Sequence, residues 1–238
     1  MFGALPAVAV GFAFILVRAH ARARAIRLSL DIVRRTRDIL ERPMRYRIAW
    51  PSDDDLVRPL RTAAACEILT SNGFVHLGDL VGVPEGGPAW SVARIYVDSA
   101  GTTIASVVRS AVFHGPTQLA LVSYASAAAF RTSRVASWLA APPSWHRQSL
   151  DALTATPQAI QRHRAFCGEA ELIAITTAEA MRERLELEHE VSMRWRNAQS
   201  PDELLLADVR SLLGARFDRD GHRLIRRLRA NVPRATVV

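Results

Sequence analysis

The chain has 238 residues, 49% hydrophobic and 23% charged, which is the composition of a folded protein and excludes a disordered one. All 31 basic residues are arginine, and the formal net charge is +8. Ten arginines and three acids lie within residues 18–47, whereas the chain from residue 48 onward has 21 arginines and 20 acids. A nucleic-acid-binding domain usually spreads basic residues over its folded surface, so we expect no nucleic-acid partner for this nearly neutral body.

The first segment, residues 2–17, carries no charged side chain and is followed at once by arginines. As a helix, the first 17 residues would span about 25 Å, a short but admissible crossing of a hydrocarbon core ~30 Å thick. The positive-inside rule places the following arginines on the cytoplasmic side. We therefore expect a single-pass anchor in the bacterial inner membrane, with the N-terminus outside and the main domain cytoplasmic. The lipid-interface residues would be Arg18, Arg22, Arg24 and Arg27.

Two alternatives to a membrane anchor remain open for this segment. The "AHA" at 19–21 resembles a signal-peptide cleavage site, although a secretory signal places its positive charge before the apolar stretch. The run could also be a buried helix of a soluble protein. Residues 24–41 have helical periodicity up to Pro43, and this helix could follow the bilayer surface, continue the anchor inward or pair with another copy.

The next part of the chain, residues 51–140, predicts an α+β domain. A helix is expected over 54–71, with "WPSDDD" before it and Asn72-Gly73 after it. The period then changes to that of strands, and "DSAG" supplies the turn of a hairpin. We expect an antiparallel meander of four or five strands, drawn from residues 74–83, 90–110, 117–126 and 127–135.

The remaining residues, 141–238, predict helices packed on the sheet. "APPSW" reads as a rigid connector, and Thr156-Pro157 and Ser200-Pro201 are typical helix starts. Basic residues dominate a last expected helix over 221–233. The predicted organisation is an anchor (1–17), a basic juxtamembrane helix and linker (18–50), the α+β domain (51–140) and the helical region (141–238).

Residues 66–166 contain a pattern shared with a known group of proteins. "LTSNGFVHLGDL" matches an L-x3-GF-x2-LGD segment, and it is followed by "GTTIASV", "FRTSR" and "IQRHRAF". The chain thus resembles a family of bacterial proteins of unknown function. The resemblance implies an antiparallel α+β domain and no catalytic activity. The chain differs from that family at "RTSRV", where an uninterrupted threonine run is usual.

The chain offers few candidates for catalysis or metal binding. Two ligands four residues apart, His163 and Cys167, would share a helix face, but no third ligand has matching spacing. Cys66 is expected on the apolar side of its helix, and no G-x-S-x-G elbow accompanies His146 and Ser149. No GxGxxG or GKS/T loop is present. We expect neither a metal nor a cofactor, and the sequence assigns no catalytic residue.

The most informative polar group lies in "HLGDL", where a Gly-Asp pair within a strand often marks a β-bulge. A candidate partner surface therefore consists of His76, Gly78, Asp79 and Trp90. The sequence favours a non-enzymatic module that binds a protein partner or assembles with itself. Two alternatives stay open: a membrane-associated, hydrolase-like enzyme that uses His and Asp residues, and a binder of anionic lipid or nucleic acid through the arginines of 18–47.

Overall fold

A computed structural model describes residues 42–110, 117–133, 140–151 and 153–213. The expected anchor at 2–17, its arginines Arg18 to Arg27, the helix at 24–41 and the basic helix at 221–233 lie outside the described residues. Within the described ranges, no helix combines the length and the apolar character that a membrane crossing requires.

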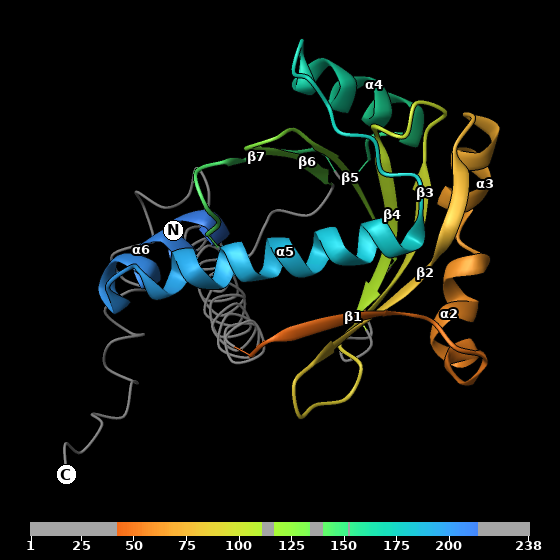
Figure 1. The fold of residues 1–238 in the computed structure, drawn as a ribbon. Coiled ribbons are helices and arrows are strands. Elements are labelled where there is room, and N and C mark those ends of the chain that lie inside the picture. Colours follow the sequence, from red (N-terminus) through yellow and green to blue (C-terminus); the bar gives the residue numbers. More distant parts are fainter. Residues whose placement is uncertain (1–41, 111–116, 134–139, 152, 214–238) are drawn as a thin grey trace, which may run out of the picture.

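The described chain forms an α+β domain around one seven-stranded sheet (Figure 1). The strands lie side by side in chain order, and every neighbouring pair is antiparallel except β6 and β7, which are parallel. Their bounds are β1 Met44–Ile48, β2 Val75–Pro84, β3 Ser91–Val97, β4 Ile104–Ser110, β5 Gln118–Tyr124, β6 Ala129–Ser133 and β7 Trp145–Ser149.

The expectation of four or five strands was too low, because it omitted the two edge strands. β1 lies within the segment assigned to the linker 18–50, and β7 lies within the region 141–238 assigned to helices. Both have five residues, and none of those in β7 is fully buried. Short, polar edge strands lack the apolar alternation by which a strand is recognised, and their pairing depends on the neighbouring strand.

One face of the sheet is covered by α2 (Asp54–Arg61), α3 (Ala64–Ser71) and α4 (Thr156–Cys167) (Figure 1). The helix expected over 54–71 is two helices, because Ala63 is extended, with φ −70° and ψ 127°. The break lets Leu60 of α2 and Leu69 of α3 both become fully buried against the sheet. A short 3-10 helix, η1 (Pro51–Asp53), precedes α2.

The other face is covered by α5 (Ala178–Asn197), which crosses the sheet (Figure 1). Met181 of α5 packs with Leu80, Ile95, Ile104 and Tyr124 in a second core cluster. The side chain of Arg196 at the end of α5 donates two hydrogen bonds, both 3.0 Å, to Asp208 of α6 (Pro201–Leu213). This pair is almost fully buried and fixes α6 to α5.

The β3–β4 turn holds the segment that leads into α5. Asp98 accepts hydrogen bonds from the backbone of Thr102 and Thr103, at 3.0 and 3.1 Å. Gly101 adopts φ +75° in this turn, and its carbonyl accepts from the amide of Ile175 at 2.8 Å. The turn therefore binds the segment before α5 by a backbone hydrogen bond, and it has no space for a side chain at Gly101.

We predict that Gly101→Ala destabilises the protein more than Gly86→Ala. Both glycines have positive φ, so alanine strains the backbone by about 1–2 kcal/mol at either position. A Cβ at Gly101 would also lie 3.1 Å from Thr176 and 3.2 Å from Ala174, whereas at Gly86 nothing lies within 4 Å. Urea unfolding of the full chain should show a further loss of about 1–3 kcal/mol for Gly101→Ala. Equal losses for the two variants would contradict this account.

Candidate functional site

A polar network occupies the start of the β2–β3 hairpin, on the face that carries α2. The predicted bulge is confirmed and lies between His76 and Gly78. Residues three apart in a regular strand point to opposite faces, but the extra residue of a bulge brings His76 and Asp79 to the same one. The Nε2 atom of His76 is 3.2 Å from Asp79 Oδ1.

Arg94 of β3 joins this pair from the neighbouring strand, because its Cα is the register partner of Asp79. Its Nη1 donates to Asp79 Oδ2 at 3.4 Å, and its Nε donates to the Tyr96 hydroxyl at 3.0 Å. The Tyr96 ring centroid lies 5.4 Å from that of His76. Asp79 is thus held between a histidine and an arginine, and its carboxylate fixes the orientation of both.

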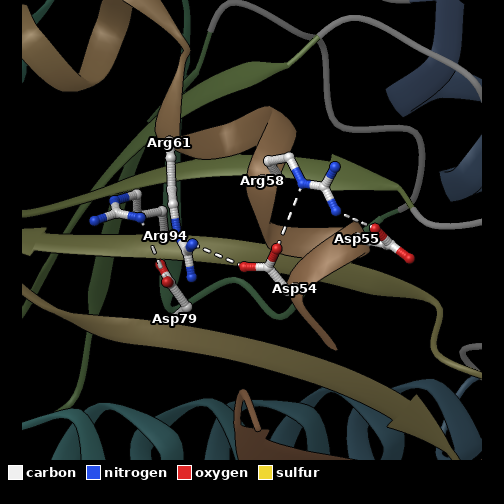
Figure 2. A network of polar contacts seen from close by, with 6 residues as sticks. All are labelled: Asp54, Asp55, Arg58, Arg61, Asp79 and Arg94. Carbon is white, nitrogen blue, oxygen red and sulfur yellow. Dashed lines mark hydrogen bonds and ion pairs between the residues drawn. The ribbon is translucent and has the colours of Figure 1, made fainter. Parts of the chain in front are cut away.

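Beside this network, α2 exposes a row of alternating charges (Figure 2). The side chain of Arg61 donates to Asp54 Oδ1 at 2.8 Å, and Arg58 contacts both Asp54 and Asp55. Asp54 and Asp55 pair with Arg58 and Arg61, and Asp79 pairs with Arg94, so the residues labelled in Figure 2 form a group that is formally neutral.

An open depression of about 520 Å³ connects the two groups. Its lining residues come from α2, α3 and β3, and they are Arg61, Cys66, Glu67, Thr70, Ser71 and Tyr96. Burial raises the pKa of Tyr96, so its phenol stays protonated at neutral pH. The Cys66 thiol is covered from solvent and donates to the Leu60 carbonyl at 3.1 Å. A thiol in that position is a buried hydrogen-bond donor and is poorly placed to attack a substrate.

Trp50 stands at the start of this surface, just before η1 and α2, and is 63% exposed. The guanidinium of Arg47 lies 4.6 Å from the ring of Trp50. Asp53 binds both partners: Arg47 Nη2 and the Trp50 amide each donate to its carboxylate at 2.8 Å. The side-chain pairing with Arg47 lowers the pKa of Asp53, which keeps the carboxylate charged. The exposed indole is therefore fixed in position.

We call these residues the α2 surface: Trp50, Asp54, Asp55, Arg58, Arg61, His76, Asp79, Arg94 and Tyr96. Of the four residues expected in a partner surface, His76 and Asp79 belong to it. Gly78 faces α5, where a Cβ would lie 3.1 Å from that of Ala178. Trp90 lies at the far end of the hairpin, with its amide donating to the Gly82 carbonyl at 2.8 Å.

The sequence analysis did not assign a role to Arg94, Tyr96 or Trp50. The sequence did contain a signal for Arg94 and Tyr96. When the two strands of the β2–β3 hairpin are aligned across the bulge, Arg94 lies opposite Asp79 and Tyr96 lies opposite His76. No comparable signal marks Trp50, since its exposure depends on how η1 turns away from β1.

His163, considered above as a metal ligand, is fully buried between α4 and the sheet. Its Nδ1 is 2.9 Å from Thr132 Oγ1, and its Nε2 is 3.0 Å from Ser123 Oγ and 3.7 Å from Cys167 Sγ. The Ser123 hydroxyl donates to the Thr102 carbonyl at 2.7 Å, so its oxygen accepts from the imidazole and we assign the ring proton to Nε2. Nδ1 then accepts from the Thr132 hydroxyl at 2.9 Å, whose one proton is shared with Gln148 Oε1 at 3.3 Å. Every polar atom of this ring then has a partner, and the network attaches α4 to β5 and β6.

Within the described ranges, no group of three or more His, Cys, Asp and Glu side chains is arranged to hold a metal ion. Comparison with models of protein families, with curated proteins and with solved structures gives no match to this chain. The family resemblance of residues 66–166 stays a prediction, and the geometry of the described residues is the basis for inferring a function.

We predict that His163 makes stability depend on pH below neutrality. Burial, followed by the nearby Arg164, lowers the pKa of His163 from 6.5 to about 4. Between these values the unfolded chain binds a proton that the folded chain does not, so stability falls as the pH falls. His163→Gln should cost about 1–3 kcal/mol at pH 7.5, and at pH 4.5 this difference should shrink by about 2 kcal/mol.

Urea unfolding midpoints of the wild type, His163→Gln and His146→Gln at the two pH values test this prediction. His146 is exposed on β7, which makes its variant the matched control. If the cost of His163→Gln is the same at both pH values, the buried neutral histidine is not the source of the pH dependence.

Proposed function

We propose that this protein is a single-pass protein of the bacterial inner membrane, anchored by residues 2–17, whose cytoplasmic α+β domain binds a protein partner through the α2 surface. A second copy of the chain is included among such partners. The proposal is supported by the exposed, fixed side chain of Trp50 and by the patterned charges beside it.

Trp50 is the observation that carries the proposal. Tryptophan and arginine are the residue types most enriched among the side chains that dominate binding energy in protein interfaces. An exposed indole normally loses rotamer freedom on binding, but the Arg47 guanidinium, itself held by Asp53, already packs against this ring. A preorganised anchor reduces the entropic cost of association.

The charged residues of α2, β2 and β3 favour a protein over other classes of partner. Three arginines and three aspartates alternate over α2, β2 and β3, and such a pattern selects a surface with the complementary order of charges. A nucleic acid or an anionic lipid surface would meet the aspartates as well as the arginines. Charge of a single sign is found instead in the sequence before the domain, at Arg18 to Arg27.

A membrane-associated enzyme is the second candidate, and the His76–Asp79 pair favours it. A carboxylate that binds Nε2 of a histidine orients the ring and leaves Nδ1 available as a base. The exposed position of His76 would give a substrate access to that nitrogen.

The anchor proposal predicts that the protein stays in the membrane pellet after an alkaline carbonate wash. Deleting residues 2–17 should move the protein to the soluble fraction, because the apolar run supplies the insertion energy. The Arg18 to Arg27 cluster should retain part of the truncated protein on anionic membranes at low salt, at ~1 kcal/mol per arginine near the surface. Release of the full chain by carbonate would contradict the anchor.

The partner proposal predicts a specific crosslinked product from the α2 surface in living cells. A photo-crosslinking amino acid at position 55, where the native side chain is 90% exposed, should give one discrete adduct. The same probe at position 153, where the native residue is 92% exposed, should not. Trp50→Ala should reduce the adduct about tenfold or more, because loss of an anchor costs at least about 2 kcal/mol.

Leu153→Ala is the matched control and should leave the adduct at position 55 unchanged. An adduct with twice the mass of the chain would identify a second copy as the partner. If Trp50→Ala leaves the adduct undiminished, Trp50 does not anchor a partner.

A further inference from the structure

The charges of α2 are ordered along the helix (Figure 2). Its first turn carries Asp54 and Asp55, and its last turn carries Arg58 and Arg61. These four side chains are between 45% and 90% exposed, and they pair with one another within the chain. Exposed ion pairs contribute little stability, so the same side chains can exchange to partners in another molecule at small cost.

This order of charges is self-complementary when two copies of α2 lie antiparallel. A two-fold axis across the middle of the helix places the first turn of one α2 beside the last turn of the other. The two aspartates of each copy then face the two arginines of the other copy. The helix dipoles are antiparallel too, so the positive end of each lies beside the negative end of the other. Parallel helices would instead bring aspartate to aspartate and arginine to arginine.

Trp50 and the open depression lie at opposite ends of the same helix. Trp50 is separated from the start of α2 only by η1, and it is 63% exposed. The depression of about 520 Å³ begins at Arg61, the last residue of α2, and its lining continues along α3 to Ser71. An eight-residue helix is about 12 Å long. The antiparallel arrangement therefore brings the indole of each copy to the depression of the other.

The depression also offers the chemistry that an indole ring binds. The Thr70 hydroxyl donates to the Cys66 carbonyl at 3.0 Å. The Ser71 hydroxyl donates to the Ile68 carbonyl at 2.9 Å. Both hydroxyl oxygens consequently present lone pairs, which match the single polar group of an indole, its N–H donor. The guanidinium of Arg61 supplies a cation for the face of the ring.

We propose that the partner of the α2 surface is a second copy of this chain, bound about a two-fold axis with the two α2 helices antiparallel. Trp50 of each copy enters the depression of the other, and the acidic start of each α2 pairs with the basic end of the other. This inference rests on the proposed function, because it requires that the α2 surface bind a protein. It adds the identity of that protein and the orientation in which it binds.

The experiment uses two full-length copies of the chain with different epitope tags, expressed together in living cells. One copy carries a photo-crosslinking amino acid at position 62, where the exposed Thr62 follows the last residue of α2. We expect an adduct that contains both tags and is joined to residues 50–53 of the other copy. An adduct joined to residues 61–63 of the other copy would show parallel helices and overturn the proposal.

Charge reversals separate contacts between copies from contacts within one chain. Asp55→Arg in both copies opposes arginine to arginine, and Arg58→Asp in both copies opposes aspartate to aspartate. Each should reduce the two-tag adduct at least about fivefold, since like charges across an interface disfavour binding. Asp55→Arg in one copy with Arg58→Asp in the other recreates both opposite-charge contacts and should restore the adduct. An equally weak adduct from the mixed pair would overturn the proposal.

Two further variants test the insertion of Trp50. Trp50→Ala removes the indole, whereas Thr70→Trp fills the depression, and either change in both copies should reduce the adduct about tenfold or more. A mixed pair of these variants keeps one indole and one open depression, so it should give more adduct than either matched pair. A variant that merely unfolds its own chain would show no such recovery, and that result would contradict the insertion.

Glu190→Arg is the matched control for the charge reversals and should leave the adduct unchanged, because this α5 side chain is 69% exposed and distant from α2 in the sequence. The outcomes also distinguish this inference from the proposed function. An adduct that contains a different protein and is lost in Trp50→Ala would overturn the second copy as partner, although the α2 surface would still bind a protein. An adduct undiminished by Trp50→Ala would overturn both.

Discussion

Burial of both faces of the sheet is the constraint on which the rest of the structure depends. The central strands β3, β4 and β5 place apolar side chains on both sides, so one layer of helices cannot cover them. α2, α3 and α4 cover one face and α5 covers the other. Any polar side chain carried by these strands is consequently enclosed between two layers, where it must find a partner or be left unpaired at a cost in free energy.

The two faces meet this requirement in different ways. Between the sheet and α4, His163, Ser123 and Thr132 complete each other's hydrogen bonds, and the result is a fixed attachment of the helix. Beneath α5, Arg131 forms an ion pair with the buried Glu188, and the Glu188 carboxylate also lies beside the Tyr124 hydroxyl. A buried ion pair contributes little net stability after desolvation.

The sequence was sufficient for those features that depend on local patterns. Alternation revealed the central strands, the Gly-Asp pair in "HLGDL" revealed the bulge, and helix starts at Thr156 and Pro201 were correct. It did not reveal β1, whose partner β2 lies beyond two helices in the sequence, or the polar strand β7 and the parallel register that sets Arg131 beside Arg147. Tyr46, Arg131 and Glu188 come together beneath α5 from three different elements, and no spacing in the sequence relates Tyr46 to Glu188.

β1 is the element that connects the α2 surface to the residues beneath α5. Successive residues of a strand point to opposite faces, and Tyr46 and Arg47 follow this rule. Tyr46 lies on the face covered by α5, where burial, followed by the Glu188 carboxylate, raises its pKa to about 12. Arg47 packs against the Trp50 ring on the α2 surface. β1 is also the first described strand after the expected anchor.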